Sequence, residues 1–206
     1  MIRTEILRDL DVVMDMLIER EQIVAIFQGQ SEWGPRALGN RSILFDPRNP
    51  QAKMIVNSVK QREDYRPFAG SVMLEHAHDY FEMKQLKESP WMSFAIQAKE
   101  KAYREVPSLV HADGTCRIQT VTREQNKNYY DLIERFYEIT GCPMIFNTSF
   151  NLGGEALVET IEDALTTCQQ SQINYLYIPE DQDFNIPYSM IKPKDISIFE
   201  IEESED

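Results

Sequence analysis

The chain has 206 residues, of which 42% are hydrophobic and 27% are charged, and its formal net charge is −13. This composition is typical of a globular protein, and the length suits one domain with a sizeable core. No apolar run could cross a bilayer, the N-terminus lacks the apolar stretch of a signal peptide, and three cysteines favour reduced thiols over disulfides. We therefore expect a cytoplasmic protein that does not contact a membrane.

Helical and strand-like segments alternate along the chain. Residues 4–20 carry apolar side chains at helical spacing, which predicts a helix with Thr4 as its N-cap. Strands are predicted at 23–29, from Phe68 onward, around Phe94, Ile118 and Ile145, and at 175–178, and helices at 49–61, 126–140 and 160–170. The alternation predicts an α/β (α+β) fold with a mixed sheet and packed helices. No linker divides the chain, so we expect one domain over 1–185 and a tail at 186–206 with a frayed acidic end.

Positive charge is concentrated in one part of this acidic chain. Residues 29–66 contain seven Lys/Arg against four Asp/Glu, and the remainder is strongly acidic. Nucleic-acid binding is disfavoured, because it needs an extended basic surface. A compact basic segment suits a small anion instead. The alternative is that these arginines only pair with nearby carboxylates.

The stretch GPRALGNRSILFDPR, residues 34–48, contains Arg36, Arg41 and Arg48. It follows a predicted strand directly, and ligands in such folds bind where strands end. Arginine offers forked donors that suit phosphate or carboxylate. The stretch lacks the P-loop pattern. Arg48 follows Asp46 closely, and we expect it to pair with that carboxylate or to cap the turn.

Two more polar clusters lie next to predicted strands. KQREDYRPFAG, residues 60–70, places Lys60, Arg62 and Arg66 between a helix and a strand, although cations there could simply complement the helix dipole. HADGTCRIQT, residues 111–120, makes a turn, after which Arg117 and Gln119 share one face of the strand. A single histidine such as His111 is more often structural than catalytic.

The fourth cluster is FNTSFNLGGE, residues 146–155. Its hydroxyls, amides and backbone N–H groups could form an anion-binding nest, or the segment could be an Asx-type turn that links a strand to a helix. His76 and His78 have no nearby third ligand, so we expect no protein-held metal site.

These four motifs, in this order, resemble the C-terminal domain of the O-carbamoyltransferases of nodulation-factor, aminoglycoside and cephamycin tailoring. The resemblance covers about residues 10–180. That domain is similar to the YrdC/Sua5 fold, a twisted mixed β-sheet with packed helices and a basic concave pocket. The K-x-R and S-x-N signature of that fold corresponds to 60–62 and 149–151 here.

The resemblance implies a specific activity. In the family, the YrdC-like domain binds carbamoyl phosphate and ATP, with Mg²⁺, and forms carbamoyl-adenylate while phosphate and pyrophosphate are released. An N-terminal domain of Kae1-like (ASKHA) fold then moves the carbamoyl group to an acceptor hydroxyl. This chain is too short to contain that domain, so we expect a Kae1-like partner protein in trans.

The resemblance also implies roles for individual residues. Lys60, Arg62 and Arg66 would hold phosphates, and Ser149 and Asn151 would bind the triphosphate or the Mg²⁺ shell. Charge on carbamoyl phosphate would be neutralised by Arg36, Arg41 and Arg117. His111 would orient the carbamoyl group or move a proton. Two further substrate-binding residues are Asn147 and Thr120.

Three alternative functions remain at this point. The chain could be a non-catalytic module that binds nucleotide or carbamoyl phosphate. It could be a YrdC-type RNA-binding protein, against which the net charge of −13 counts. It could also make threonylcarbamoyl-adenylate, although the stretches at 34–48 and 111–120 resemble the tailoring enzymes instead.

Overall fold

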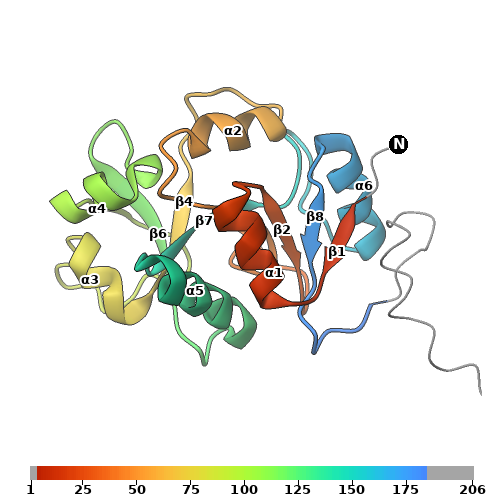
Figure 1. Ribbon diagram of the computed structural model, residues 1–206. Helices are drawn as coiled ribbons and strands as arrows, with labels where there is room; N and C mark the ends of the chain where they lie inside the picture. The colour runs from red at the N-terminus through yellow and green to blue at the C-terminus, as the bar shows by residue number, and fades with distance from the viewer. Residues whose placement is uncertain (1–3, 185–206) are drawn as a thin grey trace, which may run out of the picture.

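The computed structural model describes residues 4–184, and their strands form one mixed sheet (Figure 1). The strand order is β1-β8-β2-β3-β7-β4-β6-β5. The three central pairs, β2–β3, β3–β7 and β7–β4, are antiparallel, whereas β1–β8, β8–β2 and β4–β6 are parallel. The bounds are β1 Glu5–Leu7, β2 Val24–Phe27, β3 Arg41–Phe45, β4 Ala69–Met73, β5 Ala95–Gln97, β6 Thr115–Val121, β7 Met144–Ser149 and β8 Tyr175–Tyr177.

Helices surround the sheet on several sides. The α-helices are α1 Leu10–Met14, α2 Ala52–Val59, α3 Ala77–Tyr80, α4 Glu100–Glu105, α5 Lys127–Thr140 and α6 Ile161–Ser171. A π-helical turn, Asp15–Glu19, continues α1, and short 3₁₀ turns occupy Leu74–His76 and Pro107–Leu109. Figure 1 shows α1 and α5 in front of the sheet, α2 above it, α6 beside β8, and α3 and α4 at the opposite edge.

The two long C-terminal helices begin and end as the sequence predicts. The Asn126 side chain accepts a hydrogen bond from Tyr129 N and caps α5, and Gly141, with φ 71°, ends it. Thr160 and Asp163 form a reciprocal capping box at the start of α6. Each device satisfies backbone groups that a helix end otherwise leaves unpaired.

The N-terminal prediction is wrong, since no helix begins at Thr4. Residues Glu5–Leu7 pair with β8 as a parallel strand. The helix begins only at Leu10, where the Asp9 side chain accepts a hydrogen bond from Asp11 N at 2.8 Å. Pairing with the sheet therefore prevails over helical spacing in this short segment, because the spacing of a few apolar residues fits both structures.

Strand β3 is not predicted by the sequence pattern. Its five residues are all buried and pair with β2 on one side and β7 on the other. Burial on both faces removes the alternation of polar and apolar residues that reveals a half-buried strand. Because β3 is central, it fixes how the arginine stretch enters the sheet.

The core lies between the sheet and its covering helices, and it contains all three cysteines as free thiols. Burial raises the pKa of both Cys116 and Cys142 to about 12 and also raises that of Cys168. These thiols are therefore poor nucleophiles near neutral pH. Within residues 4–184, no helix combines the length and the apolar character that crossing a bilayer requires.

Candidate functional site

Strand pairing brings three of the sequence motifs into one row across the sheet. Ala69 of β4 lies opposite Arg117 of β6 on one side and Asn147 of β7 on the other. Paired residues of neighbouring strands point to the same face of a sheet. The row lies where β7 ends and β4 and β6 begin, so side chains from motifs far apart in sequence meet at one end of the sheet.

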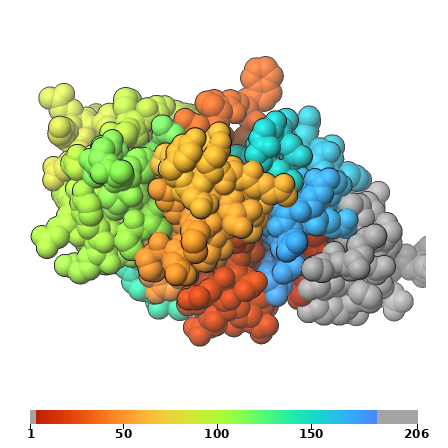
Figure 2. Space-filling model, turned by 90° about the horizontal axis from the view of Figure 1, so that it is seen from above, coloured from red at the N-terminus to blue at the C-terminus, as the bar shows by residue number. Residues whose placement is uncertain are grey.

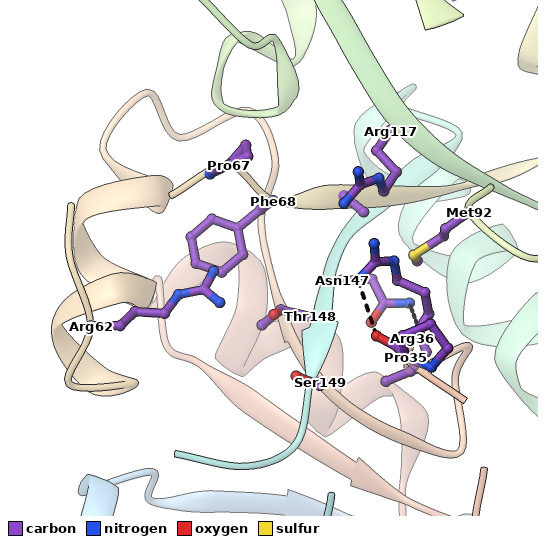
Figure 3. Close-up of a pocket in the computed structure, with 12 residues that line it drawn as sticks. Pro35, Arg36, Arg62, Pro67, Phe68, Met92, Arg117, Asn147, Thr148 and Ser149 are labelled. Carbon is purple, nitrogen blue, oxygen red and sulfur yellow. Dashed lines mark hydrogen bonds between the residues drawn. The ribbon is translucent and has the colours of Figure 1, made fainter. Parts of the chain in front are cut away.

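A cavity of about 110 Å³ lies over this row. In Figure 3 the side chains of Arg36, Arg117 and Asn147 lie together on one side, and Arg62 with the Phe68 ring lies on the other. The cavity is lined by Pro35, Arg36, Ala37, Arg62, Pro67, Phe68, Ala69, Met92, Arg117, Asn147, Thr148 and Ser149. Its size suits a small anion or one end of a larger ligand.

The cavity carries positive charge that the protein does not neutralise. Its lining contains no carboxylate, and within residues 4–184 Arg36, Arg62 and Arg117 form no ion pair. Burial and the nearby Arg117 lower the pKa of Arg36. Burial and Arg66 lower the pKa of Arg62 to about 10, against a smaller opposing effect of Glu63. A bound anion would relieve this repulsion.

Arg62 also borders a second, larger hollow of about 560 Å³. This hollow is lined by Ser58, Gln61, Arg62, Glu63, Arg66, Gly153 and Gly154. Gly153 N donates a hydrogen bond to Lys60 O at 2.9 Å, which brings the two segments together. Figure 2 shows α2 and the segment after it, in gold, on the face between the green and cyan parts of the chain. A ligand in the cavity could therefore continue past Arg62 along this surface.

The loop before β3 is held against the sheet by side-chain amides. Three consecutive carbonyls accept hydrogen bonds: Ala37 O from Asn147 Nδ2 at 3.2 Å, Leu38 O from Gln119 Nε2 at 2.9 Å, and Gly39 O from Gln28 Nε2 at 2.8 Å. The Glu32 carboxylate accepts from the backbone N–H groups of Leu38, Asn40 and Arg41. Such anchoring satisfies an irregular backbone and fixes Arg36 at the cavity.

Gly39 is required by this arrangement, and Gly39→Ala tests it. Its φ is 112°, and an added Cβ would lie 2.3 Å from the buried Tyr129 ring. We expect the substitution to lower the free energy of unfolding by about 3 kcal/mol, from overpacking and backbone strain together. Urea unfolding measures the loss.

The matched control is Gly34→Ala. Gly34 has a similar φ of 115°, but nothing lies within 4 Å of an added Cβ. The Gly34→Ala variant should lose only the backbone contribution to the free energy of unfolding, about 1 kcal/mol. Equal losses at the two glycines would show that the contact with Tyr129 is unimportant.

Lys60, Ser149 and Asn151 are brought together, but Lys60 lies behind the cavity lining. Lys60 is 2% exposed, and its Nζ donates to Ser149 O, to Asn151 O at 2.9 Å and to Asn151 Oδ1 at 2.8 Å. Burial, and to a smaller extent Arg62, lowers the pKa of Lys60 to about 7. In this structure Lys60 therefore shapes the 149–151 turn, and only Ser149 of the three lines the cavity.

The arginines of the first motif have different positions. Arg36 lines the cavity, whereas Arg48 pairs with Asp46 at 2.6 Å, as the sequence predicts. Arg41 is 3% exposed and does not line the cavity. Its guanidinium lies 3.6 Å from the centre of the Phe27 ring and donates to the carbonyls of Gln28, Asn40, Gly29 and Glu159. The structure thus gives Arg41 a structural position.

His111 and Thr120 also lie outside the cavity lining. The His111 ring lies with Nε2 3.1 Å from Phe68 O and Nδ1 3.2 Å from Thr115 Oγ1, so it positions the start of β4. Thr120 has the opposite orientation to Arg117 along β6, and its Oγ1 accepts a hydrogen bond from Ser89 N at 2.8 Å. Arg66 lines the second hollow and not the cavity, and it pairs with Glu63 at 2.8 Å.

Sequence reasoning missed several lining residues. Met92 comes from a segment far from every motif, and Pro67 and Phe68 lie in the motif at 60–70 but were not among the predicted site residues. Two residues outside the lining hold Asn147: its Nδ2 donates to Ser71 Oγ at 2.9 Å and to Gln119 Oε1 at 3.3 Å. Ser71 carried no signal in the sequence, whereas the strand pattern already placed Gln119 on one face with Arg117.

The donors present do not suit a protein-held Mg²⁺ ion. The cavity lining has no carboxylate, and Asn151 Oδ1 already accepts from Lys60. Within the described part of the chain, no three His, Cys, Asp or Glu side chains are grouped as metal ligands. Mg²⁺ prefers carboxylate and phosphate oxygens. Any magnesium ion at this cavity would therefore need oxygen ligands that the lining itself does not supply.

Comparison with known proteins identifies the family. A family model described as the carbamoyltransferase C-terminus matches residues 15–182. The chain belongs to this family. Nodulation protein NolO of Bradyrhizobium diazoefficiens is 42% identical over 158 residues, which cover 76% of this chain and 29% of NolO. Two further curated relatives, nodulation protein NolNO of Sinorhizobium fredii and an uncharacterised protein of Methanocaldococcus jannaschii, are matched over only 23% and 33% of their own length.

Solved structures of the same fold include HypF and Sua5. HypF, in its phosphate- and nucleotide-bound form, matches with a TM-score of 0.59 at 17% identity, over 86% of this chain and 25% of HypF. A Sua5 variant from P. abyssi matches with a TM-score of 0.56 at 10% identity, over 86% of this chain and 49% of Sua5. The carbamoyltransferase C-terminal domain thus has a YrdC/Sua5-like fold here, as the sequence predicts.

Proposed function

We propose that this carbamoyltransferase domain binds carbamoyl phosphate and ATP and forms carbamoyl-adenylate for transfer to an acceptor hydroxyl. The observation that carries the proposal is the cavity, where Arg36, Arg62 and Arg117 converge without a carboxylate. Carbamoyl phosphate is a small dianion that suits this charge and volume. The HypF structure with phosphate and nucleotide bound supports the same class of ligands.

The proposed reaction has two steps. Water cleaves carbamoyl phosphate to carbamate and inorganic phosphate. A carbamate oxygen then attacks the α-phosphorus of ATP, the bond from that phosphorus to the α–β bridging oxygen breaks, and pyrophosphate leaves with the electron pair. No side chain is modified, so the domain acts by positioning and charge stabilisation.

The two hollows suggest how the residues divide this work. Arg36 and Arg117 would neutralise the carbamoyl group and its phosphate. Arg62, which borders both hollows, would contact the reacting phosphate, and Arg66 would meet the pyrophosphate in the second hollow. Cations fixed where charge develops are an efficient source of rate enhancement.

The transfer step would need a companion domain or protein. The chain matches less than a third of NolO, so the remaining part of such relatives has no counterpart in this alignment. A Kae1-like partner that accepts carbamoyl-adenylate is the proposed recipient. The same observation favours the second candidate, a module that binds the substrates and reacts only together with its partner.

The test is pyrophosphate release from the chain incubated with carbamoyl phosphate, ATP and Mg²⁺. We expect release that depends on both substrates, and reactions that lack either one give the background. No release above background would overturn the autonomous reaction. If release appeared only after addition of a Kae1-like protein, the module would be the correct description.

A further inference from the structure

The buried end of the cavity is formed by the Asn147 amide. Asn147 is 1% exposed and lines the cavity from β7. Its Nδ2 donates to Ser71 Oγ at 2.9 Å and to Ala37 O at 3.2 Å, and a third acceptor, Gln119 Oε1, lies at 3.3 Å. Its Oδ1 is buried and has no hydrogen-bond partner. A buried acceptor without a donor is rare and costs stability, so it calls for an explanation.

The surrounding groups fix which end of the amide is the oxygen. Ala37 O can only accept a hydrogen bond. Ser71 donates its own proton to Gln119 Oε1 at 2.7 Å, so its oxygen is free to accept from Asn147. The Gln119 amide is oriented in turn, because its Nε2 donates to Leu38 O. A reversed Asn147 amide would place its oxygen against acceptors, so the network holds Oδ1 as the unpaired atom.

The other cavity groups do not satisfy this acceptor in the structure. Arg36 and Arg117 carry N–H groups, but neither guanidinium donates to Asn147 Oδ1, which still lacks an N–H or O–H donor. A ligand that satisfies the whole cavity therefore carries a phosphate or carboxylate oxygen and, beside it, a hydrogen-bond donor. The amino group of a carbamoyl compound provides that donor, and the methyl group of an acetyl compound does not.

We propose that Asn147 Oδ1 accepts a hydrogen bond from the carbamoyl amino group and thereby selects carbamoyl phosphate over acyl phosphates of the same size. This rests on the proposed function and adds the means of substrate choice. Ser71, Gln119 and Ala37 O are positioning groups that hold the acceptor in place. A site built around a hydrogen bond rejects an isostere that leaves its polar group unpaired.

Two stable phosphonates of nearly equal shape test the assignment without any reaction. Phosphonoacetamide carries the amino group, and acetonylphosphonate has a methyl group in its place. We expect the full chain to bind phosphonoacetamide about tenfold more tightly by calorimetry, the effect of one buried hydrogen bond. In Asn147→Ala the ratio of the two dissociation constants should fall to about one, through weaker binding of the amide alone.

Gln28→Leu is the matched control. Gln28 holds the same loop through Gly39 O, and its side-chain amide donates to Gly39 O and Asn126 Oδ1 rather than to Asn147. Loss of the Gln28 amide should weaken the binding of both phosphonates by the same factor and keep the ratio of their dissociation constants. A purely structural role of Asn147 predicts that same pattern for Asn147→Ala, and this result would overturn the assignment.

The wild-type measurements separate this proposal from the proposed function. Equal affinity for the two phosphonates would overturn the role of Asn147 and leave carbamoyl-adenylate formation standing. A tenfold preference for phosphonoacetamide without pyrophosphate release from carbamoyl phosphate and ATP would support the role of Asn147 and overturn carbamoyl-adenylate formation. Binding of neither phosphonate at millimolar concentration would overturn both.

Discussion

Replacing Arg117 with glutamine is expected to lower the rate of pyrophosphate release by about a hundred- to a thousandfold, the usual effect of removing a preorganised donor from developing charge. Arg117 stands on a strand, lines the cavity and has no ion pair within residues 4–184. Burial, and in addition repulsion from Arg117, lowers the pKa of Arg36. Removing Arg117 should therefore leave the free energy of unfolding unchanged or slightly higher.

Arg104→Gln provides the matched control. Arg104 is an exposed arginine of α4 that pairs with Glu105 outside the cavity, so its loss changes net charge equally without touching the site. Its rate should stay within about threefold of the wild type, because exposed ion pairs contribute little. If Arg117→Gln also released pyrophosphate within about threefold of the wild-type rate, the negative charge of the transition state could not develop in this cavity. Urea unfolding of both variants excludes loss of fold as the cause.

The sequence alone predicted how the site is assembled better than it predicted each residue's position. Four motifs that follow strands or a helix were expected to converge, and the register that aligns Arg117, Ala69 and Asn147 brings three of them together. Strand alternation correctly placed Arg117 and Gln119 on one face. The same rule places Thr120 on the other face, so its assignment to the site was inconsistent with the pattern.

Residue type could not separate cavity arginines from structural ones. Arg41 and Arg36 lie in one motif with similar neighbours, yet Arg41 begins the central strand β3 and is buried against Phe27. Missing β3 in the sequence therefore meant misplacing Arg41. The Asn147 network was equally invisible, since it depends on Ser71 and Gln119, which are contributed by two other strands. Such contacts follow from register, which short motifs do not encode.

Lys60 connects the motif at 60–62 to the cavity through the backbone. Its ammonium group lies behind Ser149 and holds the carbonyls of Ser149 and Asn151. Burial without a carboxylate partner lowers its pKa to about 7 from the ordinary value of 10.5. The folded chain therefore releases this proton near neutral pH, whereas the unfolded chain keeps it until about pH 10.5.

We consequently expect Lys60→Met to lower the free energy of unfolding, by an amount that grows with pH. Between pH 7 and 10.5 the unfolded wild type binds more protons than the folded one, so wild-type stability rises with pH relative to a variant that lacks this group. Near pH 9 the loss should be about 4 kcal/mol, because two buried carbonyls lose their donor. Near pH 7 it should be about 2 kcal/mol, since the wild type then still carries the cost of burying a charge.

Urea unfolding of the two proteins at pH 7, 8 and 9 measures this difference. All other titrating groups are common to both chains, so their contributions cancel when the two curves are subtracted. A difference that stays flat or shrinks towards pH 9 would mean that Lys60 remains charged in the fold. The 149–151 turn, and with it Ser149 at the cavity, would then be held by a permanent cation, and the site would be more positively charged at neutral pH than the lowered pKa implies.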